Sequence, residues 1–206
     1  MKLYYAAGTC SLSPHIVARE AGLALDLERV DIRPSPHLTA SGVDFTTVNP
    51  KGYVPALVLD DGAVLTEGAA IVQYLADLNP AAGLAPPAGT RARAELQSWL
   101  NFIATELHKM YSPWLFHPEV GAQARQVALA RIAERLAIVE RHLAPGRPFL
   151  LGDTFTAADA YLFTIVGWSE FADVDLSAFG HLRGFMTRVA SRPAVREAMR
   201  AERAAT

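Results

Sequence analysis

The segment Lys2-Leu3-Tyr4-Tyr5-Ala6-Ala7-Gly8-Thr9-Cys10-Ser11-Leu12-Ser13-Pro14 decides the fold of the first part of the chain. Residues 2–6 are rich in aromatic side chains and predict a short strand. Ser13 followed by Pro14 is typical of a helix start, because proline has a nearly helical φ and lacks only an N–H that the first turn leaves unpaired. The helix is expected to run through Ala21, with Gly22 as its C-terminal cap. A strand that leads directly into a helix indicates an α/β unit.

The following segments continue this alternation. Residues 27–31 predict a second strand, whereas residues 33–47 contain prolines and a glycine and are expected to be irregular. The turn at Asp61-Gly62 lies between two apolar runs and predicts a β-hairpin. Apolar spacing over residues 67–78 predicts a helix. Residues 1–79 are therefore expected to form a small domain with the order β-α-β-(irregular α)-β-β-α.

The second part of the chain has a different pattern. Residues 80–90 are rich in Pro, Gly and Ala and are expected to be an interdomain linker. Helical periodicity dominates residues 91–206, which predicts an all-α domain. Thr156 and Asp159 resemble a capping box, with Asp in place of the usual Glu or Gln, so we assign them to helix initiation rather than to chemistry. The expected helices cover residues 91–116, 121–143, 157–172, 178–191 and 193–203.

Composition limits the classes of function. The chain has 206 residues, 51% of them hydrophobic, and a formal net charge of −2. It has no basic excess that would bind nucleic acid or an anionic membrane, so its partners are expected to be small molecules or another protein chain. No apolar run of about 18 residues predicts a membrane span, and no secretion signal is recognisable at Met1. A single cysteine and six scattered histidines predict a reducing, cytoplasmic location and no metal site.

Cys10 is the first candidate for chemistry. It lies just before the first expected helix, where the helix dipole and unpaired N–H groups favour a thiolate. Ser13 occupies the place of the second cysteine in a C-x-x-C redox motif, so an oxidised Cys10 would need an external thiol such as glutathione. The alternative is a buried cysteine that acts as a small hydrophobe, and position alone does not decide between the two.

Two further segments are candidates for binding. Pro55 cannot donate a ladder hydrogen bond, so its strand belongs at an edge, where the backbone of Val54 could pair with an extended peptide. A simple turn and edge strand is the alternative, and that segment alone favours it. Glu67 begins an expected helix, so it could bind an ammonium while the following N–H groups bind a carboxylate. Its alternative role is only to complement the helix dipole.

Taken together, these features resemble the soluble glutathione transferases, and in particular the bacterial beta class, over nearly the whole chain. The resemblance implies a thioredoxin-like α/β N-terminal domain, an all-α C-terminal domain and a homodimer. It also implies that Pro55 is cis. The matching stretches are residues 10–13, 49–57, 66–75, 99–101, 104–109 and 155–163.

The resemblance implies a catalytic pair, Cys10 and His108. Val54 would pair with the cysteinyl unit of glutathione, and Glu67 with Gly68 would bind its γ-glutamyl end. Many relatives have serine where this chain has Gly68, which leaves only backbone N–H groups for the carboxylate. The implied glutathione-binding residues are Cys10, Ser11, Val54, Pro55, Glu67, Gly68, Asn101, Glu106, His108, Lys109 and His37, with Asn101 and Glu106 reaching across the dimer interface.

The chain departs from the family in the irregular segment after the second strand. Relatives often have a lysine there that binds the glycine carboxylate of glutathione, whereas this chain reads Arg33-Pro34-Ser35-Pro36-His37. His37 or Arg33 is the expected substitute. In the expected long helix, one polar stripe contains Asn101, Thr105, His108 and Ser112, and an adjacent apolar stripe contains Leu100, Ala104, Leu107 and Tyr111.

The leading hypothesis is a glutathione transferase with glutathione as co-substrate. It would conjugate glutathione to hydrophobic electrophiles, catalyse thiol–disulfide exchange through Cys10, or do both; peroxide reduction and dehalogenation could use the same thiol. The alternative is a non-catalytic binding or regulatory protein of the same fold. Tyr5, which other classes use to activate glutathione, is secondary to Cys10 here. The candidate electrophile-pocket residues are Tyr5, Trp114, Phe116 and Trp168.

Overall fold

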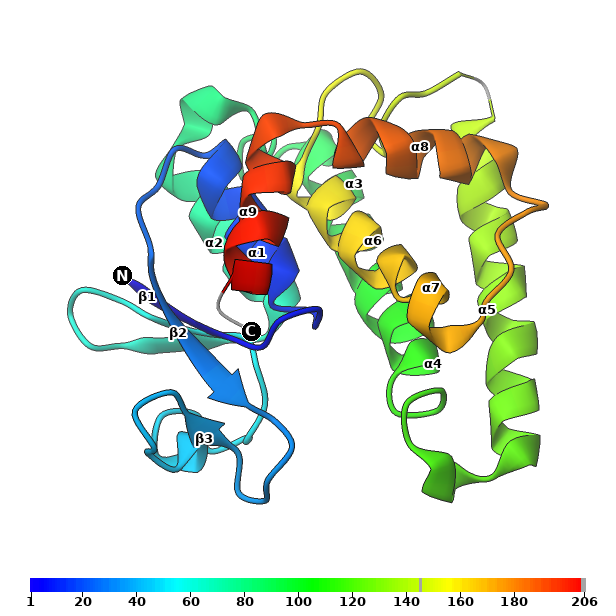
Figure 1. Cartoon of the computed structure of the whole chain (residues 1–206). Helices are drawn as coiled ribbons and strands as arrows, with labels where there is room; N and C mark the ends of the chain where they lie inside the picture. Colours follow the sequence, from blue (N-terminus) through cyan, green and yellow to red (C-terminus); the bar gives the residue numbers. More distant parts are fainter. Residues whose placement is uncertain (145, 205–206) are drawn as a thin grey trace. The chain divides into compact units, whose positions relative to one another are not determined.

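The computed structural model describes residues 1–144 and 146–204, and these form two compact units (Figure 1). The first unit contains Met1–Ala85 and the segment that starts at Arg192; the second contains Pro86–Ser191. The boundary after Ala85 falls inside the expected linker. Pro145, Ala205 and Thr206, which belong to the predicted helical domain, lie outside the described residues.

The first unit contains a five-stranded mixed sheet with the order β3-β2-β1-β4-β5. β1 and β2 are parallel, as a strand-helix-strand crossover requires, and Lys2 is aligned with Asp26. β4 pairs antiparallel with β1 and with β5, so the hairpin predicted around Asp61-Gly62 is present. The short β3 lies in the segment that the sequence predicted to be irregular. The strands are β1 (Lys2–Tyr5), β2 (Asp26–Asp31), β3 (Leu38–Thr39), β4 (Ala56–Val58) and β5 (Val64–Thr66).

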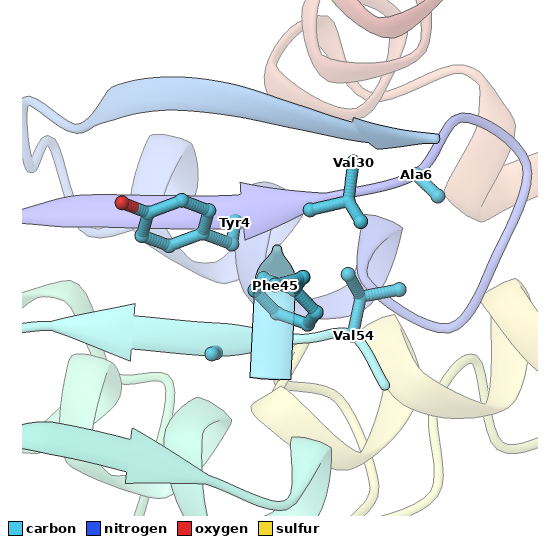
Figure 2. Packing of buried hydrophobic residues seen from close by; sticks show 6 residues of the cluster. Tyr4, Ala6, Val30, Phe45 and Val54 are labelled. Atoms are coloured by element: carbon cyan, nitrogen blue, oxygen red, sulfur yellow. The ribbon is translucent and has the colours of Figure 1, made fainter. Parts of the chain in front are cut away.

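A small apolar cluster covers one face of this sheet (Figure 2). Phe45 is fully buried in the 3₁₀ turn η1 (Phe45–Thr47), and its ring lies 5.5 Å from that of Tyr4. Val30 from β2 and Val54 from the segment before β4 point toward the same ring. The cluster therefore fixes the backbone at Val54 through its buried side chain.

Three helices of the first unit pack together: α1 (Leu12–Glu20), α2 (Gly68–Leu78) and α9 (Pro193–Ala204). A further 3₁₀ turn, η2 (Pro80–Ala82), follows α2. The position of α9 differs from the prediction that residues 91–206 form one helical domain. α9 packs on α1 because its apolar face is buried there and its polar Glu202 contacts His15 at 3.1 Å.

The regular secondary structure in the described residues of the second unit is helical, apart from an isolated β-bridge between Phe149 and Gly152. Its main helices are α3 (Arg91–Phe102), the π-helical segment η3 (Ile103–His108), α4 (Lys109–Tyr111), α5 (Ala122–Leu143), α6 (Ala157–Gly167), α7 (Ser169–Ala172) and α8 (Gly180–Ala190), with the 3₁₀ turn η4 (Pro118–Val120). No described helix of either unit is long and apolar enough to span a membrane.

The helix predicted over residues 91–116 ends earlier, at Tyr111. Pro113 has no N–H to donate and disfavours a helical conformation at the residue before it, and Ser112 is accordingly extended. The helix also changes to π-helical geometry over Ile103–His108. The predicted helix over residues 157–172 is divided into α6 and α7.

The predicted capping box at the start of α6 is confirmed. The Thr156 N–H donates to Asp159 Oδ2 at 2.8 Å, and the Thr156 hydroxyl donates to the same oxygen at 2.7 Å. Asp159 is fully buried, and so is every residue of α6 before Gly167. α6 is therefore the central helix of the second unit, and its start is fixed by hydrogen bonds rather than by apolar contacts alone.

Candidate functional site

Cys10 lies in the turn between β1 and α1. The hydroxyls of Thr9 and Ser11 donate to the Ala6 carbonyl at 2.8 and 3.1 Å and thereby hold this turn in shape. Cys10 stands two residues before the first helical residue, Leu12, as the sequence predicted, and is 9% exposed. Ser11 is fully buried, and its hydroxyl is used in the hydrogen bond to Ala6.

The sulfur of Cys10 contacts the segment that precedes β4. Sγ lies 3.4 Å from the Val54 carbonyl oxygen, a hydrogen bond that exists only while the sulfur carries its proton. Ser13, the counterpart of a resolving cysteine, donates its hydroxyl to the Cys10 carbonyl at 2.8 Å. The structure therefore brings the candidate thiol and the candidate peptide-binding edge into direct contact.

The Val54-Pro55 peptide bond is cis, as predicted. The side chain of Val54 is buried in the Phe45 cluster (Figure 2), which leaves its backbone as the part that can meet a ligand. Its carbonyl accepts from Cys10, and its N–H donates to no other residue of the described chain. A buried side chain beneath an available backbone is the arrangement that strand addition requires.

Glu67 immediately precedes α2 and has an unusual backbone conformation, with φ at +70° and ψ at 112°. Non-glycine residues in such regions cost about 1–3 kcal/mol and occur preferentially at functional sites. The side chain is 55% exposed, and Oε1 accepts from Lys51 Nζ at 2.6 Å and from the Tyr53 hydroxyl at 3.1 Å. The carboxylate is thus held at the surface by two side chains that the sequence analysis did not single out.

The pKa of the Tyr53 hydroxyl is raised, first by partial burial and then by the nearby Glu67 carboxylate. The pKa of Lys51 is raised by its hydrogen bond to the same carboxylate. Tyr53 is therefore a neutral donor near pH 7, and Lys51 is a cation. Glu67 already binds an ammonium group of its own chain.

His37 and Arg33, the two candidates for the usual lysine, lie in different places. His37 Nδ1 donates to the Gly52 carbonyl at 2.7 Å, so His37 is attached to the loop that leads to Val54. Arg33 instead forms a double hydrogen bond to Asp31, at 2.8 and 2.7 Å, and lowers the pKa of that carboxyl group. Of the two, His37 is the one beside the candidate binding edge.

Tyr5, a candidate for the electrophile pocket, is only 2% exposed. Its ring lies 6.5 Å from that of His15 on α1. Burial raises the pKa of Tyr5, with a further contribution from Glu202 on α9. The structure thus places Tyr5 in the interior of the first unit, close to α1 and α9.

The second unit contains an aromatic cluster around His108. The ring of Trp168 lies 5.0 Å from that of His108 and 5.4 Å from that of Phe116, in edge-to-face geometry both times. His108 Nδ1 lies 2.8 Å from the hydroxyl of Tyr161. The structure therefore brings together His108 and two of the predicted pocket residues, Phe116 and Trp168, and adds Tyr161. Trp114 is 38% exposed.

The other predicted residues of this unit are polar and lie along the same helical segment. Glu106 Oε2 accepts from Arg135 Nε on α5 at 2.7 Å, so its carboxylate is held by an ion pair. Asn101 and Lys109 are exposed. Leu107 and Tyr111 of the predicted apolar stripe are fully buried. Among the residues that the structure describes, no group of three or more His, Cys, Asp or Glu side chains is arranged to hold a metal ion.

Known proteins resemble the chain over both units. The family model "glutathione S-transferase, N-terminal domain" matches residues 8–78, and "glutathione S-transferase, C-terminal domain" matches residues 102–193. The chain is 43% identical to the glutathione S-transferase GstA of Escherichia coli over 202 residues, which cover 98% of each protein. The chain belongs to the glutathione S-transferase family.

Solved structures agree with this assignment. BphK, described as a bacterial glutathione S-transferase in a ternary complex, is 51% identical with a TM-score of 0.95 and covers 98% of this chain and 99% of its own. A sphingomonad glutathione S-transferase complexed with glutathione is 42% identical with a TM-score of 0.92, and the match covers 98% of both chains. The family, the fold class and the enzyme class predicted from the sequence are confirmed.

In this glutathione S-transferase, residues of the first unit that the sequence singled out separately form one continuous region. Cys10 contacts Val54, and His37 contacts the loop before it. Sequence analysis missed Lys51 and Tyr53 because they reach Glu67 across 16 and 14 residues. The available signal was their place in the 49–57 segment, which carries the family resemblance. Tyr161 was likewise inside a matching stretch, but no local pattern distinguished its hydroxyl.

Proposed function

We propose that this glutathione S-transferase binds glutathione along the first unit and places the glutathione sulfur beside Cys10. The supporting observation is the 3.4 Å contact between Cys10 Sγ and the Val54 carbonyl. An extended peptide that pairs with the Val54 backbone puts its central residue at that position. The central residue of glutathione is cysteine, so its thiol comes next to Cys10.

The γ-glutamyl end of glutathione would bind at the start of α2. Its carboxylate meets the N–H groups of Gly68 and Ala69, which have no carbonyl one helical turn earlier to accept them. Its ammonium binds Glu67, which already accepts the Lys51 ammonium at 2.6 Å. This match of charges supports the assignment of Glu67 to ligand binding rather than to dipole compensation alone.

At the other end of the tripeptide, His37 would bind the glycine carboxylate. Its Nδ1–H donates to the Gly52 carbonyl at 2.7 Å, which attaches the imidazole to the loop that leads to Val54. This role agrees with the absence of the lysine that relatives have in this segment. Arg33 is less suitable because its Nε and Nη2 already donate to the Asp31 carboxylate.

Two reactions are compatible with this arrangement. In conjugation, the glutathione thiolate attacks an electrophilic carbon and forms a C–S bond, and a leaving group departs or the product takes up a proton. In exchange, the Cys10 thiolate attacks oxidised glutathione, releases one glutathione thiolate and keeps the other glutathione as a mixed disulfide. A second thiol then restores Cys10, because the chain has no resolving cysteine.

The roles that we propose for residues of the second unit rest on the family resemblance. We assign proton transfer to His108, a positive charge near the thiolate to Lys109, and the apolar electrophile contacts to Trp114, Phe116 and Trp168. In the proposed cytoplasmic homodimer, Asn101 and Glu106 approach glutathione bound to the partner. In this chain the Glu106 carboxylate forms an ion pair with Arg135 at 2.7 Å.

The decisive experiment is mass spectrometry of the protein after incubation with oxidised glutathione. The parent is expected to gain one glutathionyl group, Cys10→Ala none, and the matched control Ser13→Ala one, as in the parent. Absence of the adduct on the parent would support the inert, buried thiol. If the parent is also not retained on immobilised glutathione, the proposal fails in favour of a non-catalytic protein of this fold.

A further inference from the structure

We infer that Tyr161 is a positioning residue that holds His108 in one orientation and in one tautomer, the one with its proton on Nε2. The inference rests on the proposed function, in which His108 exchanges a proton during the reaction. It concerns a residue that does not itself need to touch glutathione.

The contact between the two side chains is short and enclosed. The Tyr161 hydroxyl lies 2.8 Å from His108 Nδ1, and the two rings are nearly perpendicular, at 89°. Tyr161 is 3% exposed. The ring of Trp168 contacts the imidazole from another direction, with 5.0 Å between centroids and 73° between planes. One hydrogen bond and two ring contacts therefore restrict the rotation of the imidazole.

The element that carries Tyr161 is rigid. α6 is buried over ten consecutive residues, Ala157 to Val166, and begins with the Thr156–Asp159 capping box. Tyr161 follows Asp159 by two residues. Because the capping box fixes this part of α6, the Tyr161 hydroxyl is held in one position. His108 ends the π-helical segment η3, which packs against α6. π-helical turns are rare and occur often at functional sites.

The chemistry of the pair selects the tautomer. A tyrosine hydroxyl keeps its proton near neutral pH, whereas the unprotonated nitrogen of a neutral imidazole is a good acceptor. The Tyr161 hydroxyl therefore donates to Nδ1, and the single proton of neutral His108 sits on Nε2. When His108 gains a second proton, the hydroxyl rotates and accepts from Nδ1–H. In both states Nε2 carries a proton, which is what an acid–base group needs.

The direct test is nitrogen NMR of the protein labelled with ¹⁵N-histidine, with the His108 signals assigned through a His108→Asn variant. The parent is expected to show neutral His108 as a single Nε2–H tautomer. Tyr161→Phe, which removes one oxygen and keeps the ring, is expected to show both tautomers. An Nδ1–H tautomer in the parent, or an unchanged tautomer in Tyr161→Phe, overturns the inference.

Kinetics of conjugation provide the second readout. Tyr161→Phe is expected to lower kcat about tenfold and to leave KM for glutathione unchanged, because orientation of the acid–base group is lost while substrate contacts remain. The matched control is Tyr111→Phe. Tyr111 is also fully buried, its ring lies 6.2 Å from that of Trp168, and its hydroxyl contacts Ser169 at 2.6 Å without touching His108. The control is expected to retain the parent kcat and tautomer.

The two proposals fail in different ways. Equal losses of kcat in Tyr161→Phe and Tyr111→Phe would reduce Tyr161 to a packing residue and overturn the inference. A parent that forms neither a glutathione adduct nor a conjugate would instead overturn the proposed function. In that case the tautomer measurement still decides whether Tyr161 orients His108. Urea unfolding of each variant verifies that the folded protein is being compared.

Discussion

A carboxylate lies at the N-terminus of α2 and another in the first turn of α6, but the two are used differently. At the start of α2, Glu67 has a φ of +70° and a side chain that is 55% exposed, held by Lys51 and Tyr53. At the start of α6, Asp159 is fully buried and accepts from backbone N–H groups of Leu150 and Thr156 at 2.8 Å each. In the sequence, each of the two residues is an acid at the start of an expected helix.

The groups that contact each carboxylate indicate whether it serves ligand binding or folding. The oxygens of Asp159 are occupied by groups that cannot leave without unfolding the helix start, so they are unavailable to a ligand. The Glu67 carboxylate instead contacts the ends of the long side chains of Lys51 and Tyr53. A ligand can bind beside these groups or displace them. A strained backbone with an exposed carboxylate indicates function, whereas a relaxed cap with buried hydrogen bonds indicates stability.

The largest effect is expected from Asp159→Ala. The change leaves the N–H groups of Leu150 and Thr156 buried without an acceptor, and we expect the free energy of unfolding to fall by about 3–5 kcal/mol. Urea unfolding followed by circular dichroism measures it. The exposed Asp153→Ala is the control and should change stability by less than about 0.5 kcal/mol. A loss below about 1 kcal/mol for Asp159→Ala would remove the distinction between the two helix starts.

Asp159 should also make stability depend on pH. Burial raises the pKa of its carboxyl group to about 6, although the hydrogen bonds from Leu150 and Thr156 act in the opposite direction. A folded-state pKa above the unfolded value of 3.8 means that the folded protein binds more protons, so this contribution to stability decreases as the pH rises from about 4 to about 6. The expected decrease is about 2–3 kcal/mol, at 1.36 kcal/mol per pKa unit.

The measurement compares how the free energy of unfolding changes with pH in the parent and in Asp159→Asn. The absolute stability of the variant does not affect this comparison. Urea unfolding at several pH values between 4 and 7 gives the two slopes. The parent should lose more stability on going to pH 7 than the variant does. Parallel slopes would show that Asp159 does not titrate in this range.

Glu67→Gln tests the other helix start. The amide keeps the size of the side chain but has no charge for an ammonium, so we expect the Kd for glutathione to rise about 10- to 100-fold. Stability should change by less than about 0.5 kcal/mol, because exposed ion pairs such as Lys51–Glu67 contribute little. Titration calorimetry and urea unfolding give the two numbers, with Glu95→Gln on α3 as the control. A stability loss without a binding defect would make Glu67 a cap like Asp159.

The smallest effect is expected from Gly68→Ser. A Cβ at Gly68 would lie 3.8 Å from Pro55 Cγ, an ordinary contact, so a side chain fits. The added hydroxyl can donate to the ligand carboxylate, and we expect the Kd for glutathione to fall about 2- to 10-fold. Gly68→Ala adds the same carbon without the hydroxyl and separates the two contributions. Equal affinities of the serine and alanine variants would show that the carboxylate does not bind there.

The fold was predictable where one local rule acted alone. The strand and helix around Cys10, the Asp61-Gly62 hairpin and the Thr156–Asp159 cap follow from turn and capping chemistry. The two-residue β3 was not predictable, because a strand of that length has no periodicity. Pro113 was a sequence signal for the end of the helix at Tyr111. The apolar residues after Pro113 continued the helical pattern, however, so the helix was predicted to extend to residue 116. The packing of α9 on α1 is a long-range effect that no local pattern encodes.

The residues of the candidate site also fall into those that the sequence could predict and those that it could not. Cys10, Val54 and Glu67 could be found from position, because helix starts and proline-led edges have general chemistry. The partners of these residues could not be found, since Lys51 reaches Glu67 only when the loop folds back. The same holds for the hydrogen bond of Tyr161 to His108, which spans 53 residues.

The packing of α9 on α1 has a consequence for biosynthesis. A ribosome releases the strands, α1 and Cys10 long before it translates Pro193–Ala204. Until then, the side of α1 that carries His15 lacks the carboxylate of Glu202, which contacts it at 3.1 Å in the finished protein. The first unit, which bears the thiol, is therefore completed only after the second unit has been translated. A fragment cut after Ala85 would lack α9 and therefore the contact between Glu202 and His15.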